Sequence, residues 1–280
     1  MLNITFDVKA RLQLPKAANP DLQSLYIFNI YRAGSSITEA IAQSLALGSL
    51  HTEFNLVQKL DAAGVGLVDH LDYSRHSVYI DAASLTLDAL GSMGGYLYYG
   101  FREIPLPYAE RFIYNAASVI IVRDPRDIAI SQYNAVKKHV ISGASGTDIA
   151  RLRELTKTTG LDEFLLSEGT LAFIKRIMNC YAPLIKRGCK VLRYEEFMAS
   201  GQFDSGGLLK AVAGSIGDYI QLQKSISDIL ANLERRIQNS DDLKGHATGG
   251  KIHLYRSLSP DISKKLESAL KSELLLFGYL

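Results

Sequence analysis

The chain has 280 residues, of which 47% are hydrophobic and 21% charged, a composition typical of folded globular proteins and not of disordered chains. A formal net charge of +2 gives no support for a surface that binds nucleic acid or another polyanion. The two cysteines, Cys180 and Cys189, match neither a disulfide framework nor a zinc pattern, which favours a reducing compartment.

The start of the chain lacks the basic stretch and long apolar core of a signal peptide, and no window approaches about 18 uninterrupted apolar residues. We therefore expect a cytoplasmic protein without a membrane span. No repeat or linker indicates a domain boundary, so a single domain over residues 1–280 is expected. Residues 1–23, which include Pro15 and Pro20, indicate an irregular amino-terminal arm.

The first regular elements are a strand and a helix joined by a short turn. Residues 25–30 predict a buried strand, and the apolar positions from Ile37 to Leu45 recur at helical spacing. Ser35 and Ser36 stand where helix N-caps belong. Further strands are predicted at 76–80 and 96–101.

A β-branched run at 119–122 predicts another buried strand, followed by a turn and a helix over 126–139. Beyond it, residues 137–170 contain a glycine-rich loop and are expected to border the substrate pocket or form a lid. A short strand at 190–194 and mostly helical segments follow, and the last helix opens at Ser259-Pro260. Strands alternating with helices predict a doubly wound α/β fold with a parallel sheet.

The turn Arg32-Ala33-Gly34-Ser35-Ser36 has the character of a phosphate loop. Glycine lets a ligand approach the backbone, a helix N-terminus offers N–H donors, and the hydroxyls and Arg32 add further donors. The pattern of the nucleotide-triphosphatase P-loop is absent from the sequence. The alternative is a capped helix with Arg32 on the surface.

Arg123 ends the strand at 119–122, and Ser131 follows it by eight positions on the next helix. An arginine at a strand end and a hydroxyl on the following helix can direct two donors at one phosphate. The alternative is an ordinary strand–turn–helix in which the arginine only caps a carboxylate.

Taken together, these motifs resemble those of the PAPS-dependent sulfotransferases, which use 3′-phosphoadenosine 5′-phosphosulfate (PAPS). The resemblance covers about residues 24–280 and is to a bacterial-type soluble member. Its motifs are the loop 32–36, the run Arg123-Asp-Pro-Arg-Asp127 with Ser131, the strand end Tyr194-Glu195-Glu196, and a closing helix that ends at Phe277-Gly-Tyr279. It implies a three-layer P-loop-like fold with a central parallel β-sheet flanked by helices.

The resemblance also implies roles for individual residues, with PAPS as sulfuryl donor, PAP as product and no metal. The 5′-phosphosulfate would be held by Arg32, Ala33, Gly34, Ser35 and Ser36. The 3′-phosphate would be held by Arg123 and Ser131, and Tyr194 would lie near the adenine.

For catalysis, Arg32 would stabilise the oxygen that leaves as sulfur is transferred. The family places its base about twenty residues before the arginine strand end, which in this chain is Glu103. A glutamate base needs a pKa raised by burial. The alternative is a surface glutamate paired with Arg102.

Two places depart from the family pattern. Phe101 stands where many relatives carry a lysine, and the late loop at 244–256 has no tryptophan. In this loop His246 and Lys251 are the candidate phosphate donors; the alternative is a flexible surface turn.

The expected acceptor is a hydroxyl, with an amine as second choice, on a small molecule or carbohydrate. Tyrosines 96, 98, 99 and 108 either line a sugar or phenol site or fill the core. Two other functions stay open at this point: a catalytically silent module that binds PAP or PAPS, and a nucleotide-kinase-like P-loop protein. The oligomeric state is not predicted.

Overall fold

The computed structural model describes residues 15–62, 94–101, 103–104, 113, 116–138, 158–199, 202–241, 243 and 251–280. The elements in these ranges are, in chain order, β1 (Leu25–Asn29), α2 (Ser35–Leu47), β2 (Thr52–Asn55), α3 (Leu56–Ala62), β3 (Tyr96–Phe101), β4 (Ala117–Val122), α6 (Pro125–Lys138), α8 (Leu161–Leu166), α9 (Glu168–Asn179), α10 (Ala182–Lys186), β5 (Lys190–Arg193), the 3₁₀ helix η1 (Tyr194–Phe197), β6 (Met198–Ala199), β7 (Gln202–Phe203), α11 (Ser205–Ser215), α12 (Ile226–Gln238), the 3₁₀ helix η2 (Leu254–Ser257), α14 (Pro260–Ala269) and α15 (Lys271–Leu276).

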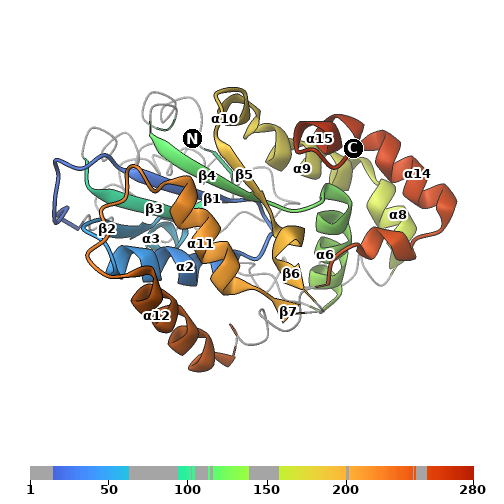
Figure 1. Cartoon of the computed structure of the whole chain (residues 1–280). Coiled ribbons are helices and arrows are strands. Elements are labelled where there is room, and N and C mark those ends of the chain that lie inside the picture. The colour runs from blue at the N-terminus through green and yellow to red at the C-terminus, as the bar shows by residue number, and fades with distance from the viewer. Residues whose placement is uncertain are drawn as a thin grey trace.

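The centre of the molecule is a five-stranded sheet with the strand order β2-β3-β1-β4-β5 (Figure 1). Every neighbouring pair in it is parallel. The pairing of β1 with β4 runs without a break from Leu25↔Ala117 to Asn29↔Ile121. The predicted α/β fold with a central parallel sheet flanked by helices is confirmed.

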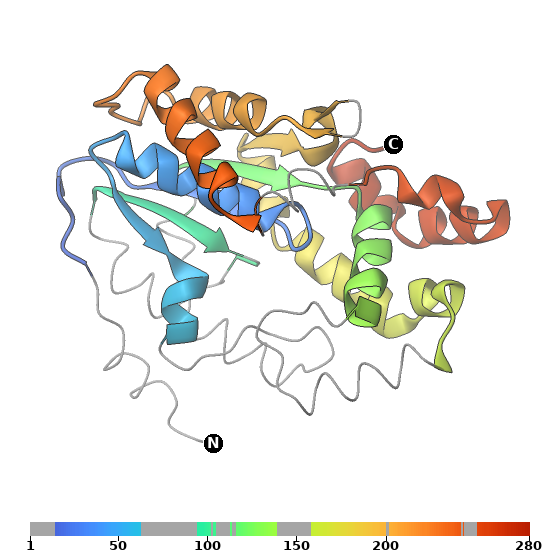
Figure 2. The same cartoon turned by 90° about the horizontal axis from the view of Figure 1, so that it is seen from below.

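Both faces of the sheet are buried, which explains why its strands read as continuous apolar runs. In β1, Tyr26 and Phe28 contribute to one core, and Leu25 and Ile27 to the other. Helices α2, α11 and α12 pack on the Leu25 face, whereas α6, α9, α14 and α15 pack on the Phe28 face. Figure 2 shows these layers on opposite sides of the strands.

The strand order places a topological switch between β1 and β4. The chain leaves β1 through α2 toward β2 at one edge, and leaves β4 through α6 toward β5 at the other. In open parallel sheets, ligands bind where the chain leaves two adjacent strands in opposite directions. The segments after Asn29 and after Val122 meet at this point.

The aromatic residues of β3 belong to the core. Tyr96, Tyr98 and Tyr99 are at most 1% exposed, and the ring of Tyr98 stacks on that of Tyr26 with centroids 4.8 Å apart. Their burial favours the core interpretation that the sequence left open. Tyr108 lies outside the described residues.

Several elements differ from the sequence prediction. Gly34 is the N-cap of α2, with no side-chain cap, so the assignment of Ser35 and Ser36 as caps is wrong. The last helix is divided at Leu270, although Ser259 does cap its start by accepting from the Ile262 N–H. The strand predicted at 76–80 lies outside the described residues.

The predicted pocket region 137–170 is described in part, since residues 139–157 lie outside the described ranges. Its described end forms α8 and the start of α9. None of the helices in the described part of the chain is long and apolar enough to cross a membrane.

Candidate functional site

The loop after β1 is held by the side chain of Asn29, the last residue of that strand. Its amide nitrogen donates to the Ala33 carbonyl at 2.8 Å and to the Thr38 hydroxyl at 3.1 Å. The Thr38 hydroxyl in turn donates to the Gly34 carbonyl at 3.1 Å. These bonds fix a loop in which both Arg32 (φ 65°) and Gly34 (φ 75°) are left-handed. Such a conformation is costly for an arginine and is typical of functional loops.

Gly34 also allows a close approach of another side chain. A Cβ atom at this position would lie 2.6 Å from Cε2 of Tyr194, so the tyrosine ring rests directly on the glycine. No side chain caps α2, whose first turn begins with Ser35 and Ser36. The unpaired N–H groups of a helix start are anion donors. The loop therefore has the backbone features expected of a phosphate site.

Arg123 joins this loop to the late part of the chain. Its Nη1 donates to the Arg32 carbonyl at 3.1 Å, and its Nη2 donates to the Lys251 carbonyl. The same Nη2 lies 3.7 Å from Oδ2 of Asp127. Within the described part of the chain, the buried Nε of Arg123 has no hydrogen-bond partner. Beside the loop, this guanidinium therefore has one buried donor without a partner among the described residues.

Ser131 completes the contact between the two predicted motifs. The Nε of Arg32, in the loop after β1, donates at 3.2 Å to the hydroxyl of Ser131, which lies on α6. Residues 99 positions apart in sequence thus meet at the switch point between β1 and β4. The structure does not support the alternative of an Arg32 isolated on the surface.

The rest of the Asp-Pro-Arg-Asp turn is engaged internally. Arg126 forms a 2.7 Å ion pair with Asp124 and a 2.9 Å ion pair with Glu267 of α14, and its guanidinium lies 3.8 Å from the Tyr255 ring centroid. Asp127 is fully buried and accepts from the Tyr255 N–H at 3.2 Å. Burial raises the pKa of Asp127, against the opposing effect of Arg123. Arg126 and Asp127 therefore use their polar groups for contacts within the protein.

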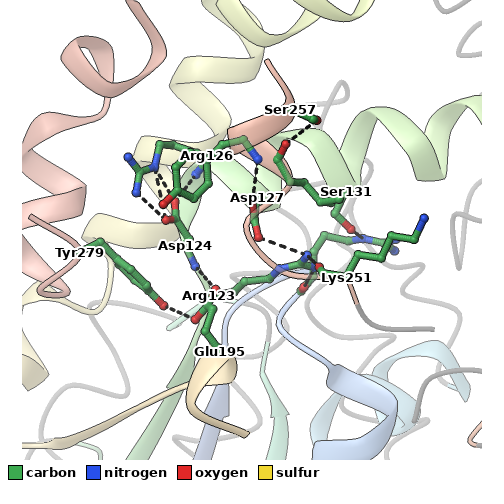
Figure 3. Close-up of polar contacts among 12 residues, drawn as sticks. Arg123, Asp124, Arg126, Asp127, Ser131, Glu195, Lys251, Ser257 and Tyr279 are labelled. Carbon is green, nitrogen blue, oxygen red and sulfur yellow. Dashed lines mark hydrogen bonds and ion pairs between the residues drawn. The ribbon is translucent and has the colours of Figure 1, made fainter. Parts of the chain in front are cut away.

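The Tyr194-Glu195-Glu196 motif contributes a ring and a buried carboxylate. Tyr194 stacks on Phe203 with centroids 4.8 Å apart, and the Arg123 guanidinium lies 5.5 Å from its ring. Glu195 accepts from the Asp124 N–H and from the Tyr279 hydroxyl, both at 2.8 Å (Figure 3). Burial raises the pKa of Glu195, and these two donors oppose the shift.

Glu103 lies just beyond the carboxyl end of β3 and is 6% exposed, so the alternative of a surface glutamate is wrong. Its Oε1 accepts from Nε and Nη2 of Arg176 at 3.2 and 3.1 Å. Burial raises the pKa of Glu103, while the charge and hydrogen bonds of Arg176 lower it. Arg102 lies outside the described residues.

The late loop is described only from Lys251 onward, so His246 lies outside the described residues. Lys251 does reach Arg123, but through its backbone carbonyl, and its side chain is exposed. Its role as a phosphate donor stays a prediction. Within the described ranges no group of three or more histidine, cysteine or acidic residues could hold a metal ion.

Sequence reasoning missed two residues of this region. Asn29 anchors the loop, and Arg176 holds Glu103. An asparagine that ends an apolar strand directly before the loop is a visible signal for the first. No sequence signal pairs Arg176 with a glutamate 73 residues away.

Comparison with known proteins adds little to this geometry. No family model and no curated protein matches the chain. Among solved structures, retinol dehydratase in complex with androsterone and the inactive cofactor PAP is similar over 97% of this chain and 85% of that chain. The sequence identity is 15% and the TM-score 0.45, a level of likeness that assigns neither a family nor a ligand to this chain.

Proposed function

We propose that the chain is a PAPS-dependent sulfotransferase that acts on a hydroxyl, or as second choice an amine, of a small molecule or carbohydrate. The observation that carries the proposal is the meeting of two motifs at the switch point. Arg32 bonds to Ser131 at 3.2 Å, and Arg123 bonds to the Arg32 carbonyl at 3.1 Å. Both motifs carry the donors that a ligand with two phosphates requires.

The residues present fit such a donor substrate. The uncapped start of α2 and the Arg32 side chain would hold the 5′-phosphosulfate. The Nε of Arg123, which has no hydrogen-bond partner among the described residues, would hold the 3′-phosphate together with the Ser131 hydroxyl. Tyr194, whose buried ring packs on Gly34 and stacks on Phe203, would lie near the adenine.

When bound, PAPS supplies a sulfuryl group whose sulfur forms a bond to the acceptor oxygen as its bond to the bridging phosphate oxygen breaks with the electron pair. Arg32 stabilises the negative charge that develops on that bridging oxygen. Glu103 accepts the proton of the acceptor hydroxyl. Because burial raises the pKa of Glu103, its carboxylate is a stronger base than an exposed one.

Thermal-shift titration with PAP, in parallel with ATP and magnesium, tests the nucleotide site. PAP should raise the melting temperature and ATP–magnesium should not. Arg123→Ala should weaken PAP binding at least tenfold, or ~1.4 kcal/mol. The matched control is Arg235→Ala, which removes an exposed arginine of α12. A chain stabilised only by ATP–magnesium would be kinase-like, and the proposal would be wrong.

Turnover of PAPS with a panel of phenols and sugars tests the chemistry. Glu103→Gln should lower turnover by about 100-fold or more, because general-base catalysis has this size, and should leave PAP affinity nearly unchanged. Near-normal turnover by Glu103→Gln would contradict the assignment of the base. Tight PAP binding without turnover on any acceptor would indicate a binding module.

A further inference from the structure

Arg176 makes an unusually specific contact with the Glu103 carboxylate. Both its Nε and its Nη2 donate to one oxygen, Oε1, at 3.2 and 3.1 Å. The side chains are 24% and 9% exposed, so the pair is largely removed from water. Two charged donors on one oxygen hold that oxygen firmly in place.

The same face of α9 also contacts the loop that carries Arg32. Phe173 lies one helical turn before Arg176, whose guanidinium is 5.3 Å from the phenylalanine ring. Phe173 meets the Tyr31 ring edge to face, with centroids 5.6 Å apart. The guanidinium of Arg32 is 6.0 Å from that Tyr31 ring. A continuous chain of contacts thus runs from the end of β3 to the end of β1.

We propose that Arg176 is a positioning residue that orients the Glu103 carboxylate and, through Phe173 and Tyr31, sets it relative to Arg32. The inference rests on the proposed function, in which Glu103 is the base and Arg32 the cation at the leaving oxygen. Helix α9 is then the part that fixes the distance between acceptor and donor chemistry. It packs on the Phe28 face of the sheet, opposite α11 and α12 (Figure 2).

The charge of Arg176 has a second consequence for Glu103. Burial raises the pKa of this carboxyl and Arg176 opposes the shift, so the arginine keeps the base ionised at lower pH. Among the described residues, the Cys180 thiol also faces this pair, and it is neutral because burial and the Glu103 charge both raise its pKa. Loss of Arg176 should therefore move the protonation of Glu103 to higher pH.

Carbon-13 NMR of protein labelled at the glutamate carboxyl carbons measures this directly, with the Glu103 signal assigned by its loss in Glu103→Gln. In Arg176→Met the titration midpoint should rise by about one pH unit or more, and the acid limb of PAPS turnover should rise with it. In Arg176→Lys the Glu103 midpoint should lie between those of the wild type and Arg176→Met, because lysine keeps the charge but not the two-donor geometry. Lys175→Met, which removes a neighbouring charge on α9, is the matched control. It should change neither the Glu103 titration midpoint nor the acid limb of the turnover profile.

The outcomes separate this inference from the proposed function. An unchanged Glu103 midpoint in Arg176→Met would overturn the inference, as would a midpoint that moves while the turnover limb stays in place. A fall in turnover with an equal rise in the KM for PAPS would also overturn it, because the residue would then act on donor binding. Absence of PAP binding by the wild-type chain would instead reject the proposed function.

Discussion

The ends of β1 and β4 are neighbours in the sheet, yet they use their polar groups in opposite ways. After β1, the loop at 30–36 is held by Asn29, and the helix that follows it starts without a side-chain cap. After β4, Arg126 is surrounded by two carboxylates and a ring. The first segment leaves the start of α2 without a side-chain cap, whereas the second uses its charges to join distant parts of the chain.

Arg123 has features of both segments. Two of its nitrogens donate to the carbonyls of Arg32 and Lys251, and its Nε stays without a hydrogen-bond partner in the described part of the chain. A motif that resembles a ligand-binding signature can thus be largely structural. The comparison between the two segments can be tested by substitution.

Arg126→Met should have the largest effect on stability, with Arg32→Met as its counterpart in the other segment. Removing Arg126 leaves the buried Asp124 carboxylate without its ion pair, so the free energy of unfolding should fall by about 3–5 kcal/mol. Arg32→Met should lower it by only about 0.5–1.5 kcal/mol, because it removes the hydrogen bond to Ser131. Urea denaturation measures both. Equal losses in the two variants would contradict a structural role that is specific to Arg126.

Gly34→Ala should have the next largest effect on stability. It combines the cost of a left-handed alanine, about 1–2 kcal/mol, with displacement of the Tyr194 ring. Gly188→Ala is a matched control, since Gly188 has φ 87° and no atom within 4 Å of the added methyl group. Denaturation should show a larger loss for Gly34→Ala, together with weaker PAP binding. Similar losses of stability in the two variants would mean that the Tyr194 ring moves aside at little cost.

Asp127→Asn should alter the pH dependence of stability. The pKa of Asp127 is raised in the folded state, so its contribution is fully present below the ordinary value of 3.8 and is lost as the pH rises through the folded pKa. The asparagine variant should lose less stability over this interval than the wild type. The slope should not vanish, because the pKa values of Glu103 and Glu195 are also raised. Denaturation midpoints from pH 4 upward give the slopes, and identical slopes would contradict the assignment.

Ser131→Ala should have a small effect on stability, similar to that of Arg32→Met. It removes one half-buried hydrogen bond to Arg32, which is worth about 0.5–1.5 kcal/mol. Its effect on PAP affinity should be larger than its effect on unfolding, if the hydroxyl serves the ligand. Ser257→Ala, which removes a local bond to the Leu254 carbonyl, is the control and should leave PAP affinity unchanged.

Most of the sheet could be predicted from the sequence, because strands buried on both faces leave long apolar runs. Residues 96–101 and 119–122 show this clearly. The strand β2, with the sequence Thr-Glu-Phe-Asn, has only two buried residues and gives no such signal. It lies at the edge of the sheet, where pairing with β3 and not composition makes it a strand.

The candidate site was predictable in its parts but not in its connections. The segments around Arg32 and Arg123 carry local patterns that a reader of the sequence can find. The bonds of Arg123 to two carbonyls, and of Arg176 to Glu103, depend on tertiary packing across 73 to 128 residues. The misplaced cap at Ser35 has a local reason: the left-handed Gly34 occupies the cap position.

The carbonyls that Arg123 joins belong to residues 91 positions before it and 128 positions after it. Loop closure over such separations is slow and comes after local structure has formed. The guanidinium can therefore reach its final partners only once the first strand and the late segment have both reached the sheet. Affinity for a nucleotide at this point would serve as a sensor of complete folding, since a partly folded chain with an intact sheet would still lack it.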